Sequence, residues 1–119
     1  MNKDIHISPF EMIGSPFCVA SDDGQKVNDR LVLALRQGVR VTVSFQNMTH
    51  LTAAFLNAAI GQLYGSFSED EIQAKLKVKN LEPEDRALLK RVVETAKAYF
   101  KDPERFKQAE EGVLGEADA

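Results

Sequence analysis

The fold of this chain is decided by residues 39–65, which read VRVTVSFQNMTHLTAAFLNAAIGQLYG. The first seven of these residues are rich in β-branched side chains and alternate between apolar and polar types. Such alternation is typical of a strand with one face in the core and the other face polar. The apolar face holds Val39, Val41, Val43 and Phe45, and the polar face holds Arg40, Thr42 and Ser44.

A helix is predicted after this strand, from about Ala53 to Tyr64, beyond a connector over residues 46–51. Its apolar residues recur at steps of three and four and form one stripe. They are Leu56, Ala59, Ile60 and Leu63. Thr52 is the natural N-cap, because its hydroxyl accepts a hydrogen bond from a free backbone N–H of the first turn.

Upstream of residue 39, the sequence predicts two short strands and a helix. Residues 5–12 alternate roughly and predict a strand that Pro9 interrupts. Residues 17–20 follow a Gly-Ser-Pro turn and predict a second, short strand. Residues 21–24 open a helix with two acids in its first turn, and Gly38 ends it.

Downstream of residue 65, the sequence predicts three helices and a strand. Ser68 is followed three residues later by a glutamate, a capping box that opens a helix to about residue 75. Residues 76–80 alternate between apolar and basic side chains, as in a half-exposed or edge strand. Residues 83–100 form the strongest amphipathic pattern, with proline at the first helical position. A last helix is expected over 103–111.

This order of elements predicts an α/β fold, with about four strands in a mixed sheet and four to five helices. The length of 119 residues fits one compact domain, which we expect over residues 1–111. The acidic residues 112–119 are expected to be a frayed C-terminal tail. The predicted core includes Val41, Val43, Phe45, Leu56, Ile60, Leu63, Leu89, Val92 and Val93.

Composition excludes several classes of partner and compartment. The chain has 15 Lys and Arg against 18 Asp and Glu, a formal charge of −3, so a nucleic-acid partner is not expected. No signal-peptide pattern and no apolar stretch of about 20 residues is present, which predicts a cytoplasmic protein with no membrane segment. Cys18 lies in an apolar run without basic neighbours and is expected to be a small core residue, not a reactive thiol.

The usual sequence signatures of catalysis are missing. The chain has no P-loop, no dinucleotide-binding glycine pattern and no Cys/His metal pattern. His6 and His50 are far apart and have no partner at ligand spacing. The acids at 69–71 and 82–85 precede predicted helices, where the helix dipole favours negative charge. We therefore expect no cofactor, no metal site and no enzymatic activity.

Residues 41–45 and 48–65 resemble the core of the STAS-like family, named for sulfate transporters and anti-sigma-factor antagonists. The run FLNAAIG at 55–61 closely matches an uncharacterised bacterial branch of that family, and the resemblance extends over about residues 19–100. In the parent family, this helix begins with an Asp-Ser-Ser-Gly-like turn. Its first serine is phosphorylated, and the surrounding surface binds a switch kinase with a GHKL-type ATPase domain. The resemblance thus implies a small STAS-like domain with a protein partner of that kind.

The chain departs from the parent pattern in this turn. Thr52 takes the Asp position, Ala53 and Ala54 take the two Ser positions, and Phe55 replaces the Gly. Alanine has no hydroxyl, so the usual phosphorylation is impossible. Thr52 is the candidate phosphorylation residue, because a phosphate there would face free helix N–H groups. The alternative is that Thr52 simply caps the helix.

Three classes of function follow. The first is a non-enzymatic regulatory interaction module, a monomer or homodimer, that docks a protein such as a GHKL-type ATPase or kinase. The second is a sensor that binds a small ligand, nucleotide or anion at the helix N-terminus after Thr52. A small hydrolase or transferase ranks lowest, since no nucleophile–base pair is present. The candidate docking surface consists of Met48, Thr49, His50, Thr52, Phe55 and Asn57.

Overall fold

The fold is taken from a computed structural model, which describes residues 4–101. The helix expected over 103–111 and the acidic tail lie outside these residues. The strands are β1 (Asp4–Ile7), β2 (Phe17–Cys18), β3 (Arg40–Ser44), β4 (His50–Leu51) and β5 (Leu76–Lys79). The α-helices are α1 (Pro9–Ile13), α2 (Ser21–Arg36), α3 (Ala53–Ala59), α4 (Glu69–Lys75) and α5 (Pro83–Lys101), and a 3₁₀ helix, η1 (Gly61–Gly65), follows α3.

The strands form two small parallel sheets, one in the order β1-β3-β5 and the other made of β2 and β4. The α/β class is confirmed, but the four-stranded mixed sheet is wrong. Parallel strands need a crossover connection, and helices supply one between β1 and β3 and between β3 and β5. β2 did not join this sheet because it pairs with β4, a two-residue strand inside the predicted connector.

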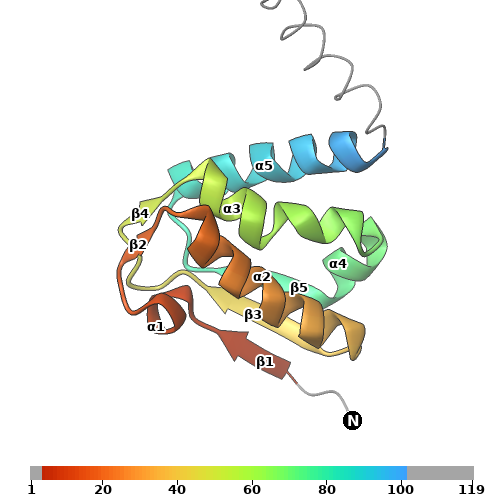
Figure 1. The fold of residues 1–119 in the computed structure, drawn as a ribbon, viewed down its shortest axis with the longest axis horizontal. Coiled ribbons are helices and arrows are strands. Elements are labelled where there is room, and N and C mark those ends of the chain that lie inside the picture. Colours follow the sequence, from red (N-terminus) through yellow and green to blue (C-terminus); the bar gives the residue numbers. More distant parts are fainter. Residues whose placement is uncertain (1–3, 102–119) are drawn as a thin grey trace, which may run out of the picture.

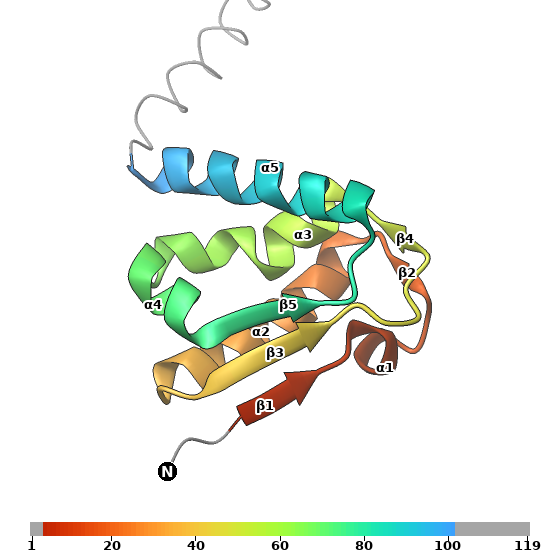
Figure 2. The same cartoon turned by 180° about the vertical axis from the view of Figure 1, so that it is seen from behind.

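The helices lie in layers over one face of the three-stranded sheet. α2 packs against β3, α3 packs on α2, and α5 packs on α3 and η1 (Figure 1). Seen from behind, the sheet lies in front of α2, and its near face carries no helix (Figure 2). The strand alternation explains this arrangement, because Val41 and Val43 are buried under the helices while Arg40 is exposed on the other side.

The core lies between this sheet and the helices. Seven of the nine predicted core residues are buried: Val41, Val43, Phe45, Leu56, Ile60, Leu63 and Val92. Leu89 and Val93 are only half-buried and pack against the edge of the core. They belong to α5, which is the outermost helix layer and therefore buries a narrower stripe than its pattern predicts (Figure 2).

Two of the predicted elements end earlier than expected and are followed by helices that were not predicted as separate elements. The first strand ends at Ile7, because Ser8 caps a new helix whose first residue is Pro9, and the Ser8 hydroxyl accepts from Glu11 N at 3.2 Å. The α-helix predicted to Tyr64 ends at Ala59 and continues as η1. The other predicted elements that fall within residues 4–101 are present, with ends shifted by a few residues.

Candidate functional site

Thr52 occupies the N-cap of α3 and uses both functions of its hydroxyl. The oxygen accepts from Phe55 N at 3.1 Å, and the O–H donates to the Val19 carbonyl at 2.7 Å. The Thr52 N–H donates to the Cys18 carbonyl at 3.1 Å. The predicted cap is confirmed, and it also joins the start of α3 to the end of β2.

Thr49 and His50 join β4 to the segment that contains β2. The Thr49 hydroxyl lies 3.4 Å from the Pro16 carbonyl, to which it donates, and 3.1 Å from Nδ1 of His50. The His50 ring packs against the Phe17 ring, with 5.0 Å between the centroids and a tilt of 48°. Thr49, His50 and Phe17 are all exposed. These contacts therefore join β2 and β4 at the surface of the protein.

Phe55 and Asn57 point in different directions from α3. The Phe55 side chain is 0% exposed and lies in the core, so it is removed from the candidate docking surface. Phe55 lies on the buried side of α3, as large apolar side chains usually do. Asn57 is exposed, as its position off that stripe predicts.

A groove lies between α3 and α5, which we call the α3–α5 groove, with a volume of about 470 Å³. Its lining residues are Ala53, Ala54, Asn57, Leu88, Arg91, Val92 and Thr95. The two alanines leave room at the first turn of α3, while Leu88 and Val92 supply an apolar wall. Asn57 and Arg91 are exposed polar groups beside it. This combination suits an apolar side chain of a protein partner with polar groups around it.

A second hollow, of about 270 Å³, lies where β3 and β5 end. Met48 and His50 of the predicted docking surface line it, together with the chain after β5. Asn47 and Asn80 both adopt left-handed backbone conformations, with φ of 70° and 61°. The charged residues of the lining, Glu82 and Asp85, are carboxylates. Their charge disfavours an anionic ligand in this hollow.

The six predicted docking residues are therefore not brought together. Asn57 lines the α3–α5 groove, Met48 and His50 line the second hollow, and Thr49 and Thr52 line neither. The α5 side of the groove, with Leu88, Arg91 and Thr95, was not among the predicted docking residues. The pair of small residues Ala53 and Ala54 was the available signal, because small side chains at a helix start leave space for a neighbour.

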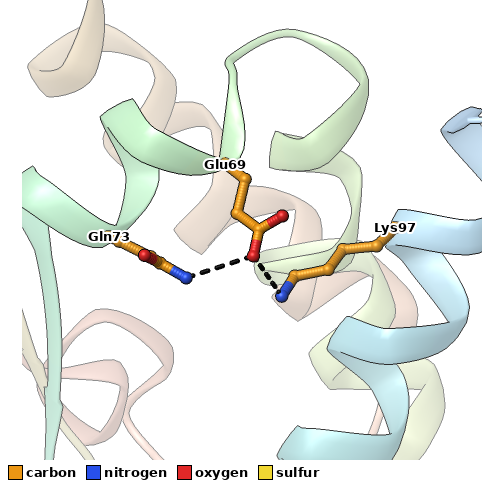
Figure 3. Close-up of polar contacts among 3 residues, drawn as sticks. All are labelled: Glu69, Gln73 and Lys97. Atoms are coloured by element: carbon orange, nitrogen blue, oxygen red, sulfur yellow. Dashed lines mark hydrogen bonds and ion pairs between the residues drawn. The ribbon is translucent and has the colours of Figure 1, made fainter.

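A polar contact joins α5 to α4 outside the groove (Figure 3). Lys97 Nζ of α5 lies 2.6 Å from Glu69 Oε1, which also accepts from Gln73 Nε2 at 3.1 Å. The hydrogen bond with Glu69 raises the pKa of Lys97. The same ammonium lies 5.9 Å from the ring centroid of Tyr64 in η1, whose own pKa is raised, mainly by burial.

Within residues 4–101, the chemistry of other reactive groups is limited. Cys18 is fully buried, and desolvation, followed by the negative charge of Asp23, raises the pKa of its thiol to about 12. The thiol therefore stays protonated at neutral pH and is a weak nucleophile. No group of three or more His, Cys, Asp or Glu side chains in this part of the chain is placed to hold a metal ion.

The parallel sheet and the helices over one face define a small α/β domain. A family model described as a STAS-like domain of unknown function matches residues 23–86, just over half of the chain. The chain therefore belongs to the STAS-like family. No curated protein and no solved structure matches it. In the described range 4–101, no helix has both the length and the apolar character needed to cross a membrane.

The matched segment runs from the first turn of α2 to the first turn of α5. It contains the α3 side of the groove, with Ala53, Ala54 and Asn57, and the whole lining of the second hollow. The α5 side of the groove begins at Leu88, beyond the match. The groove is thus built from a family segment and from the part of α5 that lies beyond the match.

Proposed function

We propose that this chain is a non-enzymatic, cytoplasmic regulatory module that binds a protein partner through the α3–α5 groove. The partner is a GHKL-type ATPase or kinase, as the resemblance to the parent STAS family implies. The observation that carries the proposal is the position of the groove. It begins at Ala53 and Ala54, which, by the resemblance, take the two serine positions of the turn whose surroundings bind a switch kinase in the parent family.

The composition of the groove supports a docking role over catalysis. Its lining combines alanine, leucine and valine side chains with an amide, a guanidinium and a hydroxyl. Arg91 forms no ion pair with any residue in the range 4–101, so its charge is available to a carboxylate of a partner. Apolar pockets with arginine beside them are typical of the centres of protein interfaces.

The state of Thr52 favours docking that does not depend on phosphorylation in this turn. Ala53 and Ala54 cannot be phosphorylated, and the Thr52 hydroxyl already caps α3 and donates to Val19. A phosphate on Thr52 would remove the donor to the Val19 carbonyl and displace the start of α3. The same contacts argue against the anion-sensor alternative, because the hydroxyl is already committed.

The test is binding of the partner by an Asn57→Lys variant. The partner is the purified GHKL-type ATPase domain from the same genome, and affinity is measured by isothermal titration calorimetry. Asn57 is exposed, so the lysine should leave the free energy of unfolding within about 0.5 kcal/mol of the parent. Because the lysine places a charge beside the apolar wall, we expect binding to weaken by about tenfold or more.

The matched control is Ala74→Lys, which adds the same charge at an exposed position of α4. This variant should bind the partner as the parent does. Equal affinity of the parent and Asn57→Lys for the ATPase would show that the α3–α5 groove is not the interface. Absence of binding by the parent itself would contradict the choice of partner.

A further inference from the structure

The face of the three-stranded sheet that points away from the helices is polar and charged. We call it the open sheet face. Strand register places His6, Thr42 and Lys77 side by side across β1, β3 and β5, Asp4 beside Arg40, and Ser44 beside Lys79. The members of this face are Asp4, His6, Arg40, Thr42, Ser44, Lys77 and Lys79.

No described helix covers the open sheet face (Figure 2). Arg40, Lys77 and Lys79 are exposed, and Thr42 and Ser44 on the central strand are half-buried. Parallel sheets are almost always covered on both faces, whereas antiparallel sheets commonly leave one face in water. An all-parallel sheet with one bare face therefore suggests that something binds there.

The charges of the open sheet face identify what would bind. Its fixed charges are three cations, Arg40, Lys77 and Lys79, and one carboxylate, Asp4. None of the three cations forms an ion pair with another residue of the described range 4–101. The whole chain carries −3, so this positive face is opposite in sign to the protein that bears it. An acidic segment is the complementary occupant.

We propose that residues 108–119 of the same chain bind the open sheet face. This stretch contains Glu110, Glu111, Glu116 and Asp118 and no lysine or arginine. Its four carboxylates pair with Arg40, Lys77 and Lys79, and Thr42 and Ser44 offer hydroxyl donors between them. The proposal is independent of the α3–α5 groove, which lies on the other side of the molecule's helix layers.

The length of the chain after α5 permits this contact. The 18 residues that follow Lys101 reach roughly 60 Å when extended. Helix layers pack about 8–10 Å apart, and two such layers separate α5 from the sheet. Tethering also gives the acidic segment an effective concentration in the millimolar range, so individually weak charge pairs suffice.

The test measures the reactivity of two lysines by acetylation and mass spectrometry. Parent protein is compared with a chain that ends at Lys107 and with a full-length variant carrying Glu110→Gln, Glu111→Gln, Glu116→Gln and Asp118→Asn. Lys77 and Lys79 should react about threefold faster or more in both variants, because the acidic segment no longer shields them. Lys90, an exposed residue of α5, is the internal reference and should not change.

Two further measurements define the outcomes. Raising the salt concentration of the parent to 0.5 M should expose Lys77 and Lys79 as truncation does, since exposed charge pairs are screened. Equal reactivity of Lys77 and Lys79 in parent and truncated chains would overturn the proposal. Protection that increases with protein concentration would also overturn it, in favour of the acidic segment of a second copy. Neither result bears on binding of the ATPase at the groove.

Discussion

The side-chain amide of Asn28 in α2 donates a hydrogen bond to the carbonyl of Ala59, the last residue of α3, at 3.1 Å. That carbonyl lacks its usual α-helical partner, because Leu63 N donates to Ile60 instead. Asn28 is only 5% exposed and is the one buried polar side chain within residues 4–101. It also accepts from Gln25 Nε2 at 3.3 Å. The free carbonyl at the end of α3 thus receives its hydrogen bond from a side chain of α2.

Replacing Asn28 with alanine should lower the free energy of unfolding by about 1–3 kcal/mol. The substitution leaves the buried Ala59 carbonyl without a donor, which costs roughly that amount. Urea denaturation followed by circular dichroism measures the change. Arg30→Ala, on the exposed side of the same helix, should change stability by less than about 0.5 kcal/mol. A similar small effect at Asn28 would mean that the bond to Ala59 contributes little.

Asn28→Asp should make the free energy of unfolding depend on pH. At neutral pH the carboxylate cannot donate to the Ala59 carbonyl, and burial of its charge is unfavourable, so its pKa in the folded state should be raised. The folded state then binds a proton more tightly than the unfolded state. The free energy of unfolding of the variant should therefore approach that of the parent as pH falls from 7 to 4. Urea denaturation at both pH values tests this. A difference in unfolding free energy that does not change with pH would contradict burial of the residue 28 side chain against the Ala59 carbonyl.

Gly24→Ala should destabilise the protein although alanine favours helix. A Cβ at Gly24 would lie 2.5 Å from the Phe55 carbonyl oxygen and 2.9 Å from the Ala58 Cβ, so α2 and α3 would have to separate. Overpacking of this kind costs roughly 1–3 kcal/mol, against a gain of about 1 kcal/mol in helix propensity. We expect a lower melting temperature. Adding Ala58→Gly should not restore it, because the backbone contact with Phe55 remains.

Thr52→Ser should be nearly silent, and Thr52→Ala should cost about 1–2 kcal/mol. Serine keeps the hydroxyl that accepts from Phe55 N and donates to Val19, whereas alanine loses both bonds. Thermal melts of the two variants give the comparison. If serine were as destabilising as alanine, the methyl group of Thr52 and not its hydroxyl would be the stabilising part.

Cys18 should be unreactive in the folded protein. Burial raises the pKa of its thiol to about 12, so the thiolate is scarce at pH 8, and Ellman's reagent should label it only after denaturation. The folded state holds this proton more tightly than the unfolded state does. The contribution of the protonated thiol to the free energy of unfolding is therefore fully present below the ordinary thiol pKa of about 8.5, and it declines as pH rises above that value. Cys18→Ala should lose stability less steeply than the parent between about pH 9 and 11.

Several elements of the fold were predictable from local patterns. The alternation over residues 39–45 predicts β3 and the face of it that is buried, and the capping box at Ser68 predicts the start of α4. Proline at position 83 and the apolar stripe after it predict α5. These features depend on residues within one or two turns of each other, which is the range over which sequence periodicity is informative.

Other elements depended on partners far along the chain. β4 was not predicted, and it exists because His50 and Leu51 pair with Phe17 and Cys18 of β2. β2 itself was predicted, but its partner strand was not. The end of α3 at Ala59 is stabilised by Asn28, 31 residues away in the sequence. The candidate site shows the same division. Asn57 was predicted to be exposed, whereas the residues that face it across the groove come from α5, more than 30 residues further along the chain.

By itself, the sequence determined the α/β class, most helices and strands, the caps at Thr52 and Ser68, and the resemblance to the STAS-like family. Only the tertiary structure decided that the sheets are parallel and separate, that Phe55 is buried, and that Ala53 and Ala54 face α5 across a groove. The physical reason is the distance along the chain over which each interaction acts. Propensity, capping and periodicity act between neighbours in the chain, whereas strand pairing, burial and grooves depend on which distant surfaces meet when apolar area is removed from water.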